Sequence, residues 1–412
     1  MKYKETPFGC VPEDWNVLPI NEITSLVTDY VANGSFASLA ENVKYKEEKD
    51  VAVLIRLVDY NRNFDGDFVY IDEHAYEFLS KSKLYGGEII ISNVGANVGT
   101  VFRCPYLPYK MSLAPNSIMV KFKGSDEFYY YWLRSPFGQH MLKSIVTGSA
   151  QPKFNKTNFR DMLAPVPPRK VQDRIVTILR TLDDKIEVNK KINKNLFDQV
   201  MALYKYVFDD ESATDRTCRA DEYFDISIGK TPPRKEQEWF SHDPKDERWV
   251  SISDMGNCGL YISDSSEYLT HDAVSRFNII VVPDNTVLLS FKLTVGRLAI
   301  TDGEMCTNEA IAHFKTVKPE INPYLYCYLK SFNYRTLGST SSIATAVNSK
   351  IIKAMPFAVP TEESLQSFNE IALPAFAAMM EKQTENRSLA NMRDSLLPKL
   401  MSGEIDVSGI DL

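Results

Sequence analysis

Short polar and basic side chains cluster at two places in each half of the chain. Hydroxyl groups, free backbone amides and one or two cations are what phosphate oxygens need, and Asn, Gln and Arg can also read base edges. These clusters therefore indicate candidate DNA contacts. The candidates in the first half are Ser92, Asn93, Asn97, Arg103, Ser149, Gln151, Lys153, Asn155, Lys156 and Arg160. The candidates in the second half are Lys292, Thr294, Arg297, Ser341, Ser342, Asn348 and Lys350.

Each cluster also has a simpler structural interpretation. Ser and Asn cap helices, so the segments around Asn155 and Asn348 fit ordinary loops that lead into a helix. The clusters around Ser92 and Lys292 fit turns between two strands with exposed polar tips. The tyrosines at 129–131 and 324–328 could stack on bases, but their helical spacing favours a place in the core. Composition alone leaves these alternatives open.

Motifs for catalysis and for metal binding are missing from the sequence. There is no G-x-x-x-x-G-K-[ST] loop, no G-x-S-x-G turn, no nuclease carboxylate cluster and no histidine pair at metal-ligand spacing. The Pro-Pro segments at 166–169 and 231–234 lack the polar first residue and aromatic last residue of the adenine methyltransferase tetrad. We therefore expect no catalytic residue and no metal in this chain.

Composition indicates a soluble, cytoplasmic protein with more than one domain. The 412 residues exceed one ordinary domain, and the six cysteines are scattered singly, as is typical of reduced thiols. No apolar run reaches the ~18 residues of a membrane span. The net charge is −7, yet residues 140–206 hold 13 basic and six acidic side chains. That stretch fits either a polyanion contact or a solvated helix face.

The two halves of the sequence repeat one plan. Asn155 precedes Pro167 by twelve residues, and Asn348 precedes Pro360 by the same separation. Ile89–Ser92 followed by Val98-Gly99 corresponds to Val287–Ser290 followed by Val295-Gly296, and Ala114–Asn116 corresponds to Cys306–Asn308. Because these matches occur in the same order in both halves, we interpret them as an internal duplication.

Each half begins with short segments that predict strands. Aromatic and β-branched residues at 51–56, 68–71, 88–92 and 117–122 are separated by Gly, Pro and Asn. Helices are expected at 125–133 and, in the second half, at 324–331, and a turn is expected at 95–99. These features predict a mixed α+β globular domain in each half.

A long helix is predicted from 169 to about 208, a stretch without Gly or Pro that follows Pro167-Pro168. Such a helix is about 57 Å long, and its heptad pattern requires a partner. We expect that partner to be the second helical stretch, 361 to about 401, packed antiparallel to the first. The expected seam positions are Ile175, Ile178, Leu182, Ile186, Asn189, Ile192, Leu196, Val200, Leu203 and Val207 in the first helix, and Asn386, Leu389, Leu396 and Leu400 in the second.

Three details of this helix pair are specific enough to test. Asn189 lies on the seam, where a buried Asn fixes register, and its repeat counterpart Asn386 is the expected partner. Pro374 is expected to kink the second helix or to divide it in two. The polar residues 209–221 are expected to be a linker. The predicted parts are globular domains at 1–165 and 209–358 and helical regions at 166–208 and 359–412.

Four segments carry a resemblance to a known family: Gly148–Asn155, Val166–Ile175, Leu179–Ile186 and Asn386–Ile405. With them, essentially the whole chain resembles the specificity subunit of type I restriction–modification systems. The resemblance implies two similar target-recognition domains separated by two long antiparallel helices, a coiled-coil spacer in a pseudo-two-fold internal repeat. The second copy departs from the pattern at 361–363, where Thr-Glu-Glu replaces the basic start of the first helix.

The resemblance also implies a function. The chain would be a non-catalytic subunit that recognises a bipartite target in double-stranded DNA, one half per domain, with the helices setting the spacer; about 57 Å corresponds to about 16 base pairs. It would assemble with two modification subunits and with restriction subunits. S-adenosylmethionine, ATP and Mg would belong to those partners, so no cofactor is expected here. A scaffold that binds only proteins, and a recognition subunit of a variant methylase system, stay open as alternatives.

Overall fold

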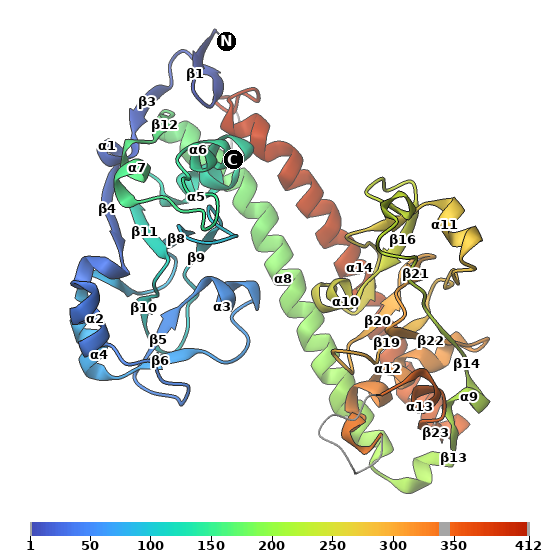
Figure 1. Ribbon diagram of the computed structural model, residues 1–412. Helices are drawn as coiled ribbons and strands as arrows, with labels where there is room; N and C mark the ends of the chain where they lie inside the picture. The colour runs from blue at the N-terminus through green and yellow to red at the C-terminus, as the bar shows by residue number, and fades with distance from the viewer. Residues whose placement is uncertain (1, 338–346, 410–412) are drawn as a thin grey trace. The chain divides into compact units, whose positions relative to one another are not determined.

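The computed structural model of the protein describes residues 2–337 and 347–409 and divides into two compact units (Figure 1). Unit 1 comprises Met1–Asp184 and Leu389–Leu412, and unit 2 comprises Lys185–Ser388. Each unit holds one α+β domain together with a segment of each of two long helices, α8 (Arg169–Phe208) and α14 (Glu362–Met401).

Two four-stranded sheets build the domain of unit 1. One has the strand order β4-β11-β8-β9 and is antiparallel; the other has the order β6-β5-β10-β7, with β5 and β10 parallel. Two further antiparallel pairs are β1–β2 and β3–β12. The strands are β1 (Tyr3–Thr6), β2 (Gly9–Pro12), β3 (Asn16–Pro19), β4 (Thr24–Asp29), β5 (Ala52–Ile55), β6 (Val69–Ile71), β7 (Lys83–Leu84), β8 (Ile89–Ser92), β9 (Val101–Arg103), β10 (Lys110–Leu113), β11 (Ser117–Phe122) and β12 (Leu163–Val166).

Unit 2 repeats this design. Its five-stranded sheet has the order β14-β22-β19-β20-β17, and its four-stranded sheet has the order β15-β18-β16-β21, in which β16 and β21 are parallel. A further antiparallel pair is β13–β23. The strands are β13 (Thr214–Arg219), β14 (Asp225–Ile228), β15 (Phe240–Ser241), β16 (Glu247–Val250), β17 (Tyr261–Ile262), β18 (Tyr268–Leu269), β19 (Val287–Ser290), β20 (Leu298–Thr301), β21 (Cys306–Thr307), β22 (Ile311–Lys315) and β23 (Pro356–Pro360).

Short helices connect the strands of both units. In unit 1 they are α1 (Ile20–Ile23), α2 (Phe36–Asn42), α3 (Leu57–Asn61), α4 (Glu73–Phe78), α5 (Asp126–Arg134), α6 (Pro136–Ser144) and α7 (Lys156–Asp161). In unit 2 they are α9 (Ala220–Tyr223), α10 (Ile252–Asn257), α11 (His271–Arg276), α12 (Asn322–Ser331) and α13 (Ser349–Lys353). The expected strands and the helices expected at 125–133 and 324–331 are thereby confirmed within one or two residues.

Matched hydrogen bonds confirm the internal duplication. In both units a strand of the parallel pair runs into a helix whose third residue is an aspartate, Asp59 in unit 1 and Asp254 in unit 2, and this carboxylate accepts from the amide of the residue before the helix, Arg56 or Ser251. A buried tyrosine of a later helix, α5 in unit 1 and α12 in unit 2, then donates its hydroxyl to a strand carbonyl. Tyr129 donates to the oxygen of Pro165 at 3.2 Å, and Tyr324 donates to that of Ala358 at 2.7 Å. Identical bonds at matched positions are what two copies of one fold require.

Polar contacts fix the antiparallel register of α8 and α14 inside unit 2. The Asn189 side chain is fully buried, and its Nδ2 donates to Asn386 Oδ1 and to Glu385 Oε2, both at 2.9 Å. Asn193 Nδ2 donates to the carbonyl of Met379 at 3.1 Å. The expected pairing of Asn189 with Asn386 is confirmed. The seam position predicted at Ile192 is wrong, because that side chain is 39% exposed and Asn193 faces the partner helix instead.

Inside unit 1, the same two helices bury aliphatic side chains. Ile175, Leu179 and Leu400 belong to the core that also contains Trp132 and Phe128 of α5. Asp183 accepts hydrogen bonds from Arg393 Nη1 and from the Tyr131 hydroxyl, each at 2.7 Å. Of the other predicted seam residues, Leu396 packs on this core, Leu196 and Leu203 pack on the core of unit 2, and Leu182 and Leu389 are half-buried.

Two breaks that the sequence suggested are not found: α14 is not divided in two at Pro374, and residues 209–221 are not all linker. The helix α14 continues through Pro374 and Pro398 as one element, so neither proline divides it. Pro374 is an exposed position, where water can satisfy the carbonyl that loses its helical donor. The expected linker at 209–221 contains β13, which pairs with β23 from Thr214 to Arg219; its side chains are mostly exposed, so the backbone pairing with β23 and not a buried face makes it a strand.

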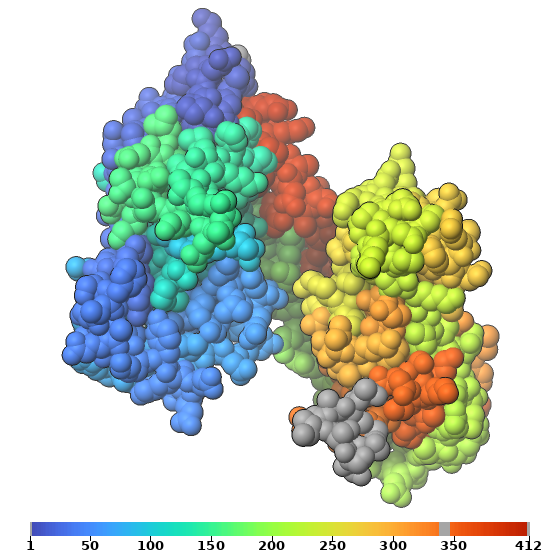
Figure 2. All heavy atoms as spheres, in the orientation of Figure 1, coloured from blue at the N-terminus to red at the C-terminus, as the bar shows by residue number. Residues whose placement is uncertain are grey.

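The N-terminal strands pack on the end of α14 within unit 1, where the blue and red surfaces meet in Figure 2. The Tyr3 hydroxyl donates to the carbonyl of Gly403 at 3.1 Å, and Phe8, Val11 and Trp15 share a core with Leu400. This contact explains why residues 389–409 belong to unit 1. Across the part of the chain described here, no helix combines the length and apolarity that a bilayer crossing requires.

Candidate nucleic-acid interface

The two polar clusters predicted in the first half form one surface in unit 1. The β8–β9 hairpin and the loop that follows α6 are joined by backbone bonds, from Gly95 N to Pro152 O at 2.9 Å and from Phe154 N to Asn93 O at 3.1 Å. A β-bridge links Val94 to Lys153. The Asn93 side chain adds a bond from its Nδ2 to the Phe154 carbonyl at 3.1 Å. The structure thus brings together residues that lie some sixty positions apart in the sequence.

Several of the predicted contacts in unit 1 have structural roles instead. Asn155 caps α7, Lys156 pairs with Asp29 at 2.8 Å, and Arg160 donates to the carbonyl of Val27 at 2.9 Å. Arg103 lies 4.2 Å over the Tyr130 ring and also pairs with a glutamate of α5. Ser92 is 2% exposed, so its hydroxyl cannot reach a ligand. These side chains stabilise the fold around the surface, and we no longer count them as candidate DNA contacts.

Four predicted contacts in unit 1 remain available. Asn97 is exposed at the hairpin, and Ser149, Gln151 and Lys153 are exposed in the adjoining loop. Among the described residues their side chains have no hydrogen-bond or ion-pair partner. One cation beside amide and hydroxyl groups suits a phosphate contact next to a base contact.

The hairpin between β19 and β20 takes the same place in unit 2. Gly296 N donates to Ser290 O at 2.9 Å, as Gly99 N donates to Ser92 O at 2.8 Å in unit 1. Lys292 and Thr294 are exposed at its tip. The predicted contact Arg297 is instead bound to the carbonyl of Ile252 at 2.6 Å.

The rest of the second cluster is divided between roles. Asn348 caps α13 and accepts bonds from the amides of Lys350 and Ile351, which is the structural alternative foreseen for it. Lys350 is exposed and stays a candidate. The candidates Ser341 and Ser342 lie outside the described residues.

Sequence reasoning missed one cation beside the hairpin of unit 2. Arg335 is exposed and lines a hollow of about 420 Å³ together with Val295, Asn333, Tyr334 and Leu337. The guanidinium has no partner among the residues described. Its position in the sequence, just ahead of the polar cluster that begins at Gly338, was the available signal, because the matching polar cluster of the first half also carries a free cation, Lys153.

The basic stretch 140–206 is mostly a solvated helix face. Along α8, basic and acidic side chains pair one turn apart at Arg169–Asp173, Arg180–Asp184 and Lys190–Glu187. Such exposed pairs support a helix by a few tenths of a kcal/mol each. The surplus of positive charge on this helix therefore does not indicate a DNA-binding surface.

Aromatic residues of α5 and α12 are core residues, as their spacing favoured. Tyr129, Tyr131 and Trp132 are buried in unit 1, and Tyr324 and Tyr326 are buried in unit 2. Burial raises the pKa of the Tyr129 and Tyr324 hydroxyls well above the ordinary value. These rings are thus unavailable for stacking on bases.

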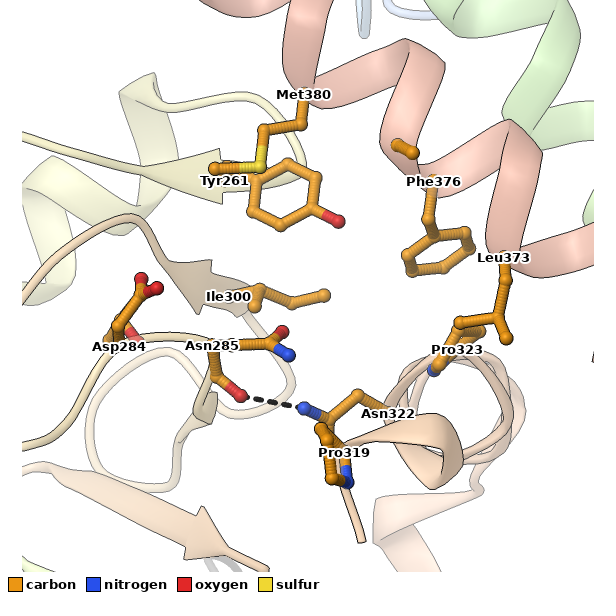
Figure 3. A pocket seen from close by; sticks show the side chains of 12 residues that line it. Tyr261, Asp284, Asn285, Ile300, Pro319, Asn322, Pro323, Leu373, Phe376 and Met380 are labelled. Carbon is orange, nitrogen blue, oxygen red and sulfur yellow. Dashed lines mark hydrogen bonds between the residues drawn. The ribbon is translucent and has the colours of Figure 1, made fainter.

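A separate cavity of about 270 Å³ in unit 2 lies between α14 and the sheet (Figure 3). Tyr261, Phe376 and Met380 give it an apolar wall. At its floor Asn322 Nδ2 donates to the carbonyl of Asn285 at 2.6 Å, the bond drawn as a dashed line in Figure 3. Among the described residues that line the cavity, Asp284 alone is charged, and it repels phosphate, so the cavity does not belong to the DNA-binding surface.

Comparison with known families identifies the domain that the chain repeats. Residues 12–197 and 217–385 match the family of type I restriction modification DNA specificity domains. The chain belongs to this family. The two matched ranges begin in the domains of unit 1 and unit 2 and end within α8 and α14, so each copy of the repeat is one specificity domain.

The chain is similar to named specificity subunits of type I restriction enzymes along most of their length. The MjaIX specificity subunit of Methanocaldococcus jannaschii is 23% identical over 98% of this chain and 97% of its own length. The HindI specificity subunit of Haemophilus influenzae is 21% identical over 72% of this chain and 80% of its own. A solved S subunit of a type I system from M. genitalium aligns over 94% of this chain and 96% of its own, with 14% identity and a TM-score of 0.49.

Proposed function

We propose that this chain is the DNA-recognition subunit of a type I restriction–modification complex. Unit 1 reads one half of a bipartite target in double-stranded DNA, and unit 2 reads the other half. The observation that carries the proposal is the duplicated specificity domain, in which each copy presents a strand hairpin with exposed polar side chains at its tip.

The contacts proposed for the two halves differ in kind. Asn97 and Gln151 offer amides for base edges in unit 1, where Lys153 serves a phosphate. In unit 2 the equivalent groups are Thr294 for a base or sugar, with Lys292 and Arg335 for phosphates. Different side chains on one scaffold would give two different half-sites.

The chain itself is proposed to catalyse nothing. Specificity subunits are named for recognition, and two modification subunits are proposed to bind S-adenosylmethionine and to methylate adenine. Restriction subunits are proposed to supply ATP- and Mg-dependent cleavage. The continuous helices α8 and α14, shared by both units, are proposed to set the number of base pairs between the half-sites.

Gel-shift titration of the full chain on duplexes of varied sequence tests this function, with and without the modification subunit. Preference for particular duplexes is expected, and its salt dependence reports the number of phosphate contacts. Equal binding to all duplexes, or none, in both preparations contradicts recognition and favours a protein-only scaffold.

A further inference from the structure

The tip of the unit 2 hairpin exposes one apolar side chain completely. Leu293 is 99% exposed and lies between two exposed polar neighbours, Lys292 and Thr294. Its φ is +60°, in the left-handed region that leucine rarely adopts. The amide of Thr294 donates to the carbonyl of Lys292 at 2.7 Å, which closes a three-residue γ-turn around Leu293.

The hairpin holds this conformation through a buried serine. Ser290 is fully buried, and its Oγ donates to the carbonyl of Thr294 at 2.6 Å while accepting from the amide of Arg297 at 3.0 Å. The Arg297 guanidinium is anchored on the carbonyl of Ile252 at 2.6 Å. Backbone strain persists only where surrounding bonds over-determine it, and such sites concentrate where a protein acts on a ligand.

Unit 1 has no equivalent of this side chain. Its hairpin carries Gly95, Ala96 and Asn97 at the tip, and Gly95 is bonded to the neighbouring loop. The exposed apolar side chain at the tip is therefore found in unit 2 alone of the two units, although the glycine-to-serine backbone bond of the hairpin occurs in both.

We infer that Leu293 is a wedge that inserts between two base pairs of the half-site read by unit 2. The inference rests on the proposed DNA-recognition function. Proteins that deform DNA insert leucine, phenylalanine or methionine side chains between base steps, which unstacks the bases and bends the duplex. Lys292 beside the leucine, with Arg335 nearby on the same unit, supplies the cations that hold the flanking phosphates.

The wedge predicts a particular form of specificity. Pyrimidine–purine steps unstack most readily, so the half-site of unit 2 contains such a step at the point of insertion. Leu293 itself makes no hydrogen bond to a base edge. Preference at that step therefore depends on how easily the DNA deforms.

The test uses the full chain with its modification subunit and a duplex chosen by selection from random sequences. A 2-aminopurine probe is placed at successive positions of each half-site, and its fluorescence rises where a base unstacks. The wild-type protein is expected to raise the signal at one step of one half-site. Leu293→Ala removes the side chain and Leu293→Gly also relieves the backbone, and both abolish the rise and weaken binding by about tenfold.

Three further measurements separate insertion by Leu293 from a general weakening of the DNA contact. Leu293→Met retains the signal, because an unbranched apolar side chain also inserts. Val317→Ala is the matched control, since Val317 is 96% exposed on another loop of unit 2, and this change leaves signal and affinity unaltered. An unchanged salt slope in Leu293→Ala is expected, because no phosphate contact is lost.

Other outcomes overturn the inference in distinguishable ways. If the wild-type complex prefers a duplex but no probe responds, or if Leu293→Ala binds that duplex as tightly as wild type, the wedge is wrong and the recognition function stands. If Leu293→Ala loses only the modification subunit, Leu293 is a protein contact and not a wedge. If the wild-type complex prefers no duplex, the recognition function fails as well.

Discussion

Units 1 and 2 share a backbone design but place different groups at matched positions. Both hairpins close with a glycine amide bonded to a buried serine carbonyl, at Ser92 in unit 1 and at Ser290 in unit 2. Only Ser290 uses its hydroxyl to brace the turn, and only its hairpin carries a strained, exposed leucine. Duplication thus preserved the scaffold while the tips diverged, as expected of a protein that reads two unlike half-sites.

The cores differ in the same way. His313 pairs with Leu288, two residues before Ser290, and Met119 pairs with Ile90, two residues before Ser92, so the two side chains occupy equivalent sites. His313 lies between the hydroxyls of Ser227 and Thr307, at 2.9 and 2.7 Å. Unit 2 therefore has a hydrogen-bonded histidine at the core position where unit 1 has the thioether side chain of Met119.

The helix segments of the two units also rely on different polar anchors, and the largest predicted effect lies there. Asn189→Ala in unit 2 leaves the Asn386 amide oxygen without its donor, removes one of the two donors to Glu385 Oε2 and opens a cavity, so the free energy of unfolding should fall by about 2–3 kcal/mol. Urea denaturation measures it. Ile192→Ala, one turn away on the exposed face, should cost no more than about 0.5 kcal/mol. Equal losses would show that Asn189 is not the anchor.

Acid sensitivity should distinguish the two cores. Burial lowers the pKa of His313 to about 3, against roughly 6.5 in an unfolded chain. The unfolded state therefore takes up the proton first, and stability from the neutral His313 is complete above pH 6.5 and is lost as pH falls towards 3. By pH 5 the loss is about 2 kcal/mol.

His313→Met, which introduces the residue of unit 1, should remove that part of the pH dependence. Urea denaturation of the full chain at pH 7 and pH 5 measures the difference between wild type and variant. An identical pH dependence in both proteins would contradict a buried neutral histidine.

The two hairpin serines provide a smaller contrast. Ser290→Ala removes two hydrogen bonds and leaves the partly buried Thr294 carbonyl and Arg297 amide without the serine, for an expected cost of about 1–2 kcal/mol. Ser92 is as deeply buried, but its hydroxyl makes no side-chain hydrogen bond among the described residues, so Ser92→Ala should change stability by no more than about 0.5 kcal/mol. Thermal unfolding of both variants tests this, and a reversed order would refute the bracing role of Ser290.

The smallest predicted difference is between two neighbouring lysines of unit 1. Lys153→Ala should lower the salt slope of DNA binding by about 1 and leave stability unchanged, because its ammonium is unpaired among the residues that the structure describes. Lys156→Ala should leave the slope unchanged and cost up to about 1 kcal/mol of stability, because it breaks the ion pair with Asp29. Matching slopes in the two variants would contradict the division between contact and structural residues.

Regular patterns in the sequence predicted most of the fold. A heptad pattern without Gly or Pro predicted α8. The matches that occur in the same order in both halves predicted the duplication and the Asn189–Asn386 pair. Pro374 does not divide α14, because a proline on an exposed face of a long helix removes a bond that water can replace. Ile192 misled because it is apolar and lies next to the true seam position: the strict three-four spacing from Asn189 to Leu196 passes through Asn193, whose polar side chain bonds the partner helix.

The candidate interface was predictable only in part. Residue type placed Asn97, Gln151, Lys153 and Lys292 on exposed loops, where they are found. It could not separate Lys153 from Lys156, because only folding brings Asp29 beside Lys156. Residue type also gave no reason to select Leu293. Neither the left-handed turn nor the complete exposure of its side chain can be predicted from the local sequence.

The central claim, that each unit reads one half-site, is tested most directly by selecting duplexes from a random library with the full chain and its modification subunit. Two preferred half-sites separated by an unread spacer of fixed length are expected. Gln151→Ala should alter the preference in one half only, and Thr294→Ala in the other half only. A single uninterrupted site, or a change in both halves from either substitution, would contradict the claim.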